Sequence, residues 1–192
     1  MAGRFAQRPP AERRQATEAL ITARGSDVQR WSEPENLKSN WARRAEAAAR
    51  LVPPGARVLD IGCGAMDLER FLDPSVAYVP ADVVKRDERT LLCDLNAGEF
   101  PAVESDVVSL LGVLEYVHDV PALFARLRRT GAKVIVSYNP VELGKSDRDR
   151  RAQGWFNDLT SAEICAEALN AGFRFVGMVT IDSQHLYEFS PA

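Results

Sequence analysis

The feature that most constrains the fold is an alternation of short apolar runs with helix-forming segments from residue 56 onward. The runs expected to form strands are residues 56–62, 76–82, 89–94, 105–112, 132–138, 173–182 and 184–190. Helix-forming segments at 67–72, 120–129 and 161–172 separate several of them. Strands that alternate with helices predict a mostly parallel sheet with helices on both faces. The last two runs are joined by too short a link for a helical crossover, so we expect that pair to be antiparallel.

The N-terminal part of the chain has a different pattern. Residues 1–10 are basic and end in two prolines, which is typical of a disordered tail. One helix is expected over residues 11–24, and a second begins at Pro34 and runs to about Arg50. We therefore divide the chain into an N-terminal tail with lid helices, at 1–52, and an α/β domain at 53–192.

Composition excludes several classes of partner. The 192 residues suffice for one domain with a full core, and their net charge of -3 gives no general attraction to nucleic acid or to acidic membranes. No apolar run approaches the roughly 18 residues that a membrane helix needs. The first 20 residues lack the apolar stretch of a secretory signal, and the three cysteines share no metal-ligand spacing. We expect a cytoplasmic protein with reduced thiols, no bound metal, and neither nucleic acid nor membrane as a partner.

Candidate site residues follow from the strand ends, because ligands of open α/β sheets bind beyond the carboxyl ends of the strands. The first strand ends in Asp60-Ile61-Gly62-Cys63-Gly64. The two glycines allow a sharp turn and leave no side chain between the backbone and a ligand. The carboxylate of Asp60 would pair with a ligand ammonium group.

The next two strand ends are also acidic. Asp82, followed by Val83, ends the second strand, and a carboxylate there accepts hydrogen bonds from both hydroxyls of a ribose. The third strand ends in Cys93-Asp94-Leu95, which combines an acceptor for an exocyclic amine with an apolar wall. Sites for an ammonium, a ribose and an adenine, in that order, describe a pocket for S-adenosylmethionine.

These residues carry a family resemblance that runs from about Leu37 to the C-terminus. VLDIGCG, the acidic strand ends, and SDVVSLLGVLEYVHD resemble successive motifs of class I S-adenosylmethionine-dependent methyltransferases, and the middle of the chain is loosely similar to the methionine-biosynthesis methyltransferase-like group. The resemblance implies a Rossmann-like α/β fold with seven strands, mostly parallel with an antiparallel last strand. It also implies methyl transfer from S-adenosylmethionine. The absence of a large inserted domain favours a small-molecule or glycan acceptor.

The resemblance implies the following cofactor contacts. Asp60, Gly62, Cys63 and Gly64 would surround the methionine part, Asp82 and Val83 the ribose, Asp94 and Leu95 the adenine, and Leu110 and Leu111 the sulfonium. Lys38 and Trp41 precede the first strand, so Lys38 would pair with the cofactor's carboxylate while Trp41 shields the sulfonium. Alternatively, Trp41 only packs its helix onto the sheet.

No catalytic residue is assigned, but three are candidates. Tyr116 replaces the histidine of the LEHV stretch common in the family, and His118 follows the fourth strand, either as a general base or as an exposed residue at a helix start. Tyr138 belongs to Tyr138-Asn139-Pro140, which resembles part of the Asn-Pro-Pro-Tyr motif of amino-methylating enzymes but follows the fifth strand. One of the next aromatic residues, Trp155 or Phe156, is expected to reach the pocket.

One position departs from the family pattern. Met66 stands where the first loop usually has its third glycine, so its side chain either crowds the cofactor or points away and packs on Trp41 or Leu68. A dinucleotide-binding fingerprint would need a glycine at Asp67, whose charge would repel a pyrophosphate. The remaining alternatives are a non-catalytic S-adenosylmethionine-binding module and another group transferase on the same fold.

Overall fold

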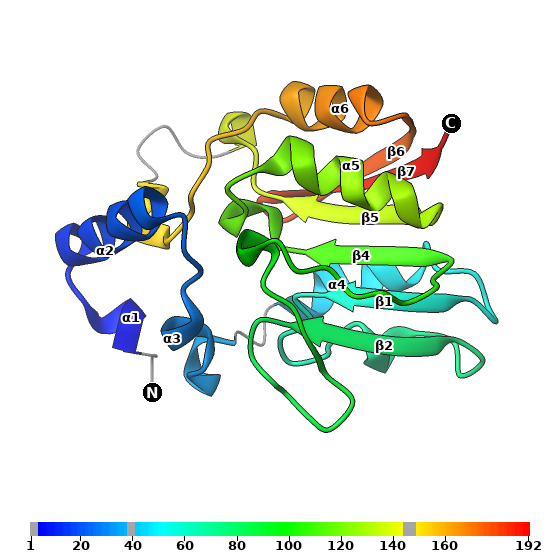
Figure 1. Ribbon diagram of the computed structural model, residues 1–192, viewed down its shortest axis with the longest axis horizontal. Helices are drawn as coiled ribbons and strands as arrows, with labels where there is room; N and C mark the ends of the chain where they lie inside the picture. The colour runs from blue at the N-terminus through cyan, green and yellow to red at the C-terminus, as the bar shows by residue number, and fades with distance from the viewer. Residues whose placement is uncertain (1–3, 38–40, 144–148) are drawn as a thin grey trace.

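The computed structural model describes residues 4–37, 41–143 and 149–192. Its sheet has seven strands in the order β3-β2-β1-β4-β5-β7-β6 (Figure 1). The strands are β1 (Arg57–Ile61), β2 (Ala77–Asp82), β3 (Leu91–Leu92), β4 (Val107–Leu111), β5 (Lys133–Tyr138), β6 (Phe173–Ile181) and β7 (Gln184–Pro191). The first five pair in parallel, and β7 lies antiparallel between β5 and β6. The predicted sheet is confirmed.

Helices cover both faces of this sheet. The α-helices are α1 (Arg4–Gln7), α2 (Pro10–Ala23), α3 (Val28–Trp31), α4 (Ala42–Ala49), α5 (Val120–Thr130) and α6 (Ser161–Asn170). The 3-10 turns are η1 (Pro34–Asn36), η3 (Glu69–Phe71), η4 (Leu95–Ala97), η5 (Leu114–Tyr116), η6 (Val141–Leu143) and η7 (Arg151–Gln153). Leucine and phenylalanine side chains of α5 pack on one face, and the small alanines of α4 let that helix approach the other.

Three expectations about local structure were wrong. The helix expected from Pro34 to Arg50 is divided into η1 and α4, because Leu37 is extended and the buried side chain of Asn36 donates to the carbonyl oxygen of Arg30. The tail expected to be disordered contains α1, and Phe5 is buried beneath the guanidinium of Arg30 at 4.0 Å. The third strand contains only Leu91–Leu92 within the run expected to form it.

Helices α1, α2 and α3 lie beyond the carboxyl ends of the parallel strands, on the side to which the arrowheads of β1, β2, β4 and β5 point in Figure 1, whereas α4 packs on a face of the sheet. Side chains tie them to the loops there. Arg14 pairs with Asp149, and the buried hydroxyl of Thr17 donates to the carbonyl oxygen of Arg151 at 2.8 Å. This placement sets residues 4–31 against the edge of the sheet where ligands of such folds bind.

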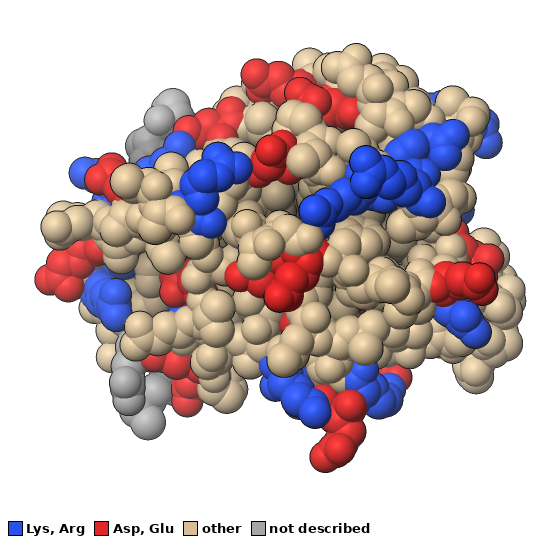
Figure 2. All heavy atoms as spheres, viewed as in Figure 1, with Lys and Arg blue, Asp and Glu red and all other residues tan. Residues whose placement is uncertain are grey.

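The surface shows no large field of one sign on the face in view. Acidic and basic side chains are interspersed there, apart from a row of basic residues along α5 (Figure 2). One of these, Arg128, donates to the carbonyl oxygen of Gly172 and therefore has a structural partner. Within the described residues, no helix combines the length and apolar character needed to cross a bilayer.

Candidate functional site

A cavity whose empty volume is about 1050 Å³, with the solvent-filled space at its mouth included, opens at the carboxyl ends of β1, β2 and β4. Its wall combines the loop after β1 with residues of the N-terminal segment, of η4 and of η5. Ligand pockets are typically concave and mostly apolar with a few placed polar groups. The sequence-predicted residues that line the cavity are Trp41, Asp60, Gly62, Cys63, Gly64, Asp82, Val83, Asp94, Leu95 and Leu111.

The loop after β1 needs its glycines. Gly62 has a φ of 73°, and a Cβ atom there would collide with the side chain of Val113. Gly64 has a φ of 52° and donates its backbone N–H to Asp82 at 2.9 Å. The left-handed backbone at both positions is accessible to glycine without steric cost. The loop therefore exposes its backbone to the cavity.

Asp60 lies at the deep end of the cavity and is 3% exposed. Its carboxylate accepts hydrogen bonds from the hydroxyl of Ser109 at 2.6 Å and from the hydroxyl of Tyr78 at 2.7 Å. Burial raises the pKa of Asp60 to about 6, although both hydroxyls and the nearby Arg44 oppose the shift. The group is therefore a carboxylate at neutral pH that becomes neutral in mild acid.

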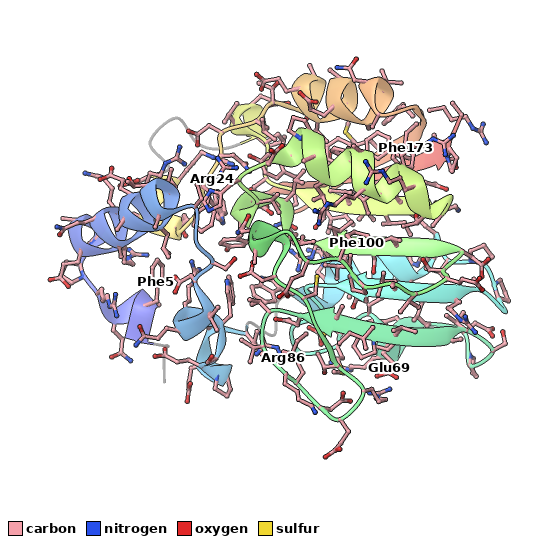
Figure 3. All side chains as sticks on the ribbon, in the orientation of Figure 1. Phe5, Arg24, Glu69, Arg86, Phe100 and Phe173 are labelled. Carbon is pink, nitrogen blue, oxygen red and sulfur yellow. The ribbon has the colours of Figure 1, made fainter. Side chains whose placement is uncertain are left out.

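Asp82 is buried at the tip of β2, where its carboxylate accepts four hydrogen bonds from N–H groups and a weaker one from the thiol of Cys63 at 4.0 Å. The backbone N–H groups of Gly64 and Val84 donate at 2.9 and 3.0 Å. The guanidinium of Arg86 donates through Nε and Nη2, each at 3.2 Å. Figure 3 shows Arg86 on the loop after β2, near the N-terminal helices, and its Nη1 donates to the carbonyl oxygen of Trp31 at 2.8 Å.

Asp94 links the end of β3 to the N-terminal segment. Its carboxylate caps η4 by accepting from the backbone N–H groups of Asn96 and Ala97. The same carboxylate accepts from the hydroxyl of Ser26 at 2.6 Å. The side chain of Leu95 lines the cavity beside it. An amine acceptor and an apolar wall are therefore adjacent.

One predicted cofactor residue that the structure describes, Leu110, is not at the cavity wall. Leu110 is fully buried in the core under α5, because successive side chains of β4 point to opposite faces, and we leave it out of the site. Lys38 lies outside the described residues. Cys63 is 7% exposed, and burial raises the pKa of its thiol well above the usual range. A thiol shifted in this direction is unreactive at neutral pH.

Among the three catalytic candidates, Tyr116 lines the cavity. Burial raises the pKa of its phenol above the ordinary value. Tyr138 is fully buried elsewhere, where its hydroxyl donates to Asn157 and its pKa is raised to about 12. His118 stacks on Phe156 at 4.6 Å, with its Nε2 atom 3.0 Å from the carbonyl oxygen of Gly25. Neither Tyr138 nor His118 lines the cavity, so the structure does not place them as bases there.

Met66 does not line the cavity. Its Sδ atom lies 3.5 Å from a guanidinium nitrogen of Arg89, which does not line the cavity either, so the side chain points away from the site. The residue has a φ of 58°, the left-handed conformation that a third glycine would adopt freely. The departure from the glycine pattern therefore strains the loop without crowding the site.

Sequence reasoning missed several residues of the cavity wall, chiefly Arg44, Arg86 and Trp31. Arg44 donates to the side chain of Gln184 at 2.9 Å, and its Nε atom has no partner among the described residues. A Cβ atom on Gly112 would lie 2.5 Å from the same guanidinium. Arg44 lies one helical turn after Trp41, and this spacing is the sequence signal that could have identified Arg44 as a residue of the cavity wall. Phe156, rather than Trp155, lines the pocket.

Comparison with known proteins gives concordant matches. A family described as a methyltransferase domain matches residues 34–176. The ubiquinone biosynthesis O-methyltransferase of Rhodopseudomonas palustris (strain BisB5) is 31% identical over an alignment of 103 residues, and the match covers 44% of this chain and 41% of that protein. The chain thus spans less than half of that relative's length.

Two solved structures share the fold. A SAM-dependent methyltransferase from Aquifex aeolicus has a TM-score of 0.64 at 12% identity, with 85% of this chain and 97% of that chain covered. CalO1, a methyltransferase of calicheamicin biosynthesis in its S-adenosylhomocysteine-bound form, has a TM-score of 0.63 at 21% identity, with 82% and 56% covered.

Proposed function

Because the chain belongs to the methyltransferase domain family, we propose that it transfers a methyl group from S-adenosylmethionine to a small-molecule or glycan acceptor. One observation carries this proposal. Asp60, Asp82 and Asp94 line one cavity from the tips of three neighbouring strands. Their order along the sheet matches the ammonium, ribose and adenine of the cofactor. CalO1, which shares the fold, was solved with S-adenosylhomocysteine bound.

The described residues fit the cofactor in charge as well as in order. Asp60 supplies a carboxylate for the ammonium group. Arg44, with its unpartnered buried Nε, supplies a cation for the carboxylate of the same methionine part. We therefore propose that Arg44 pairs with the cofactor's carboxylate. The contact predicted for Lys38 with the same carboxylate stays a prediction. Gly62 and Gly64 leave room beside the backbone for the cofactor.

When bound, the cofactor supplies a sulfonium methyl group that a nucleophile displaces in line. The chain's own contribution is to align the acceptor and to exclude water, and good alignment is worth roughly 7–11 kcal/mol. Trp31 and Tyr116 meet edge to face with ring centroids 5.1 Å apart, and Tyr116 meets Phe156 at 6.0 Å. These rings form an apolar wall for the acceptor. Within the described residues, no cluster of metal-ligating side chains is present.

The test is a pair of measurements on the parent protein. In calorimetry, S-adenosylmethionine and S-adenosylhomocysteine are expected to bind at one site and NAD is expected not to bind. In a second assay, label passes from methyl-labelled cofactor to a component of a metabolite extract. Tight NAD binding would contradict the cofactor assignment. Cofactor binding without transfer to any extract would instead support a non-catalytic binding module.

We keep the cytoplasm as the proposed location. We also propose that the acceptor is not a nucleic acid, because the net charge is -3 and acidic and basic side chains are interspersed on the face in view outside the row along α5, where Arg128 already donates to the carbonyl oxygen of Gly172 (Figure 2). A salt titration of binding to duplex DNA is expected to give no affinity at physiological ionic strength. Salt-sensitive binding there would overturn this part of the proposal.

A further inference from the structure

The hydrogen bonds that Asp82 accepts occupy all the lone-pair positions of its carboxylate. A carboxylate has about four lone-pair positions, and four N–H groups occupy those of Asp82. The two from Gly64 and Val84 belong to the backbone of turns and are the shorter pair. The two from Arg86 are the longer pair and come from a side chain.

The guanidinium and a ribose diol present the same pattern of donors. Nε and Nη2 of Arg86 point two parallel N–H groups at the two oxygens of Asp82, in the bidentate geometry typical of such pairs. A ribose offers two neighbouring hydroxyls to the same pair of oxygens. Both ligands therefore require the same two lone pairs.

We infer that Arg86 competes with the cofactor's ribose for Asp82 and thereby sets the affinity of the site. This inference rests on the proposed function, which puts the ribose at Asp82. The backbone donors cannot withdraw without unfolding their turns, so the side chain of Arg86 must turn aside when the ribose binds. Its third donor, Nη1, has a separate partner in the carbonyl oxygen of Trp31, which holds the arginine at the cavity wall during the exchange.

The surroundings of the Arg86–Asp82 pair make its displacement by the ribose unfavourable, which lowers the affinity for the cofactor. The side chains of Arg86 and Asp82 are 11% and 5% exposed, so water screens their attraction weakly. The loop that carries Arg86 is itself fixed, because the buried Thr90 hydroxyl accepts the backbone N–H groups of Arg86 and Asp87. The competition therefore comes from a preformed contact and not from a mobile surface arginine.

Arg86→Ala tests the inference against a matched control. The variant is expected to bind S-adenosylhomocysteine about 5- to 30-fold more tightly than the parent, because the ribose no longer displaces a charge-assisted pair. Arg89→Ala removes the same charge from the same loop, but its partners are Glu69 and Asp87, so its affinity should equal the parent's. Arg86→Lys keeps the charge without the fork and should fall between the parent and the alanine variant.

A second ligand distinguishes competition for Asp82 from a general effect of removing the charge and volume of the Arg86 side chain. The advantage of Arg86→Ala should disappear for the 2′,3′-dideoxy analogue of S-adenosylhomocysteine, which makes no demand on Asp82. Equal or weaker binding of S-adenosylhomocysteine to Arg86→Ala overturns the inference, as does the same gain for both ligands. If the alanine variant does not fold, the lysine variant decides by the same criteria. A parent protein that binds no S-adenosylhomocysteine would overturn the proposed function itself.

Discussion

At the scale of single residues, cofactor binding depends on the carboxylates at the strand tips. Asp82→Ala should weaken S-adenosylhomocysteine binding by about 1–3 kcal/mol, the cost of losing hydrogen bonds to a charged group. The matched control is Asp73→Ala, because Asp73 is an acidic residue that caps an exposed turn before β2. Calorimetry on both variants and the parent gives the comparison. If Asp82→Ala binds S-adenosylhomocysteine with the parent's affinity, the assignment of the ribose to Asp82 is wrong.

Asp60 predicts a pH dependence of binding. An ammonium group pairs with the ionised carboxylate, and the pKa of Asp60 is about 6 when the site is folded. Affinity for S-adenosylhomocysteine should therefore be constant from pH 8 to about 7 and fall as the pH drops through 6. Asp60→Asn should bind more weakly at neutral pH and lose that fall. The check is a series of dissociation constants between pH 5 and pH 8, and a parallel fall in the variant would contradict it.

The same carboxyl predicts a stability effect of definite sign. Its folded pKa lies above the ordinary value of 3.8, so the folded state binds the proton more tightly than the unfolded state does. The contribution of Asp60 to the free energy of unfolding is therefore largest below pH 4 and declines as the pH rises to about 6. Comparing denaturant midpoints of the parent and Asp60→Asn across that interval isolates this contribution from those of other carboxyls.

Met66 predicts an effect on stability without one on binding. Its left-handed backbone costs a non-glycine residue roughly 1–2 kcal/mol, which glycine avoids. Met66→Gly should therefore be more stable than Met66→Ala by about 1 kcal/mol, while both bind S-adenosylhomocysteine as the parent does. Thermal melts with and without ligand measure both quantities. Tighter binding in both variants would mean that the methionine side chain reaches the cofactor after all.

At the scale of elements, the N-terminal helices are tied to the site by the carboxylates assigned to the cofactor. Ser26 donates to Asp94, and the carbonyl oxygen of Trp31 accepts from the arginine that holds Asp82. We therefore keep the prediction that residues 11–50 act as a lid that gains hydrogen-exchange protection when cofactor product binds. Maximal protection over 35–45 without ligand, together with unaltered binding by Lys38→Ala, would make these helices a scaffold.

Ser26 offers a single-residue test of that tie. Ser26→Ala should weaken binding of S-adenosylhomocysteine about 2- to 10-fold, because one hydrogen bond that positions Asp94 is lost. Ser32→Ala is the control, since the Ser32 hydroxyl donates within the N-terminal segment to the carbonyl oxygen of Val28. Calorimetry of the two variants decides. Equal effects from both would indicate that the segment, and not its contact with Asp94, matters for binding.

Local patterns in the sequence predict some of these elements and not others. The sheet and the acidic strand tips were predictable, because alternating strands and helices bring the carboxyl ends of parallel strands to one edge. The break after Asn36 was not, because a buried amide that satisfies the carbonyl of Arg30 outweighed the helical pattern. Arg86 was missed for a similar reason. Its partner Trp31 is distant in the sequence, and no local pattern records that contact.

At the scale of the whole molecule, the described parts of the chain form one site from segments far apart in the sequence. Residues of the N-terminal helices, of three strand tips and of the loop at Phe156 line a single cavity. The division into a lid at 1–52 and a domain at 53–192 stays a prediction. The same holds for the identity of the acceptor, for which the aromatic wall of Trp31, Tyr116 and Phe156 is the surface to examine.

The most direct test of the central claim is a crystal structure of the parent protein with S-adenosylhomocysteine. We expect adenine beside Asp94 and Leu95, both ribose hydroxyls on Asp82 with Arg86 turned aside, and the amino acid part between Asp60 and Arg44. A ligand bound elsewhere, or in the cavity with its ribose away from Asp82, would contradict it.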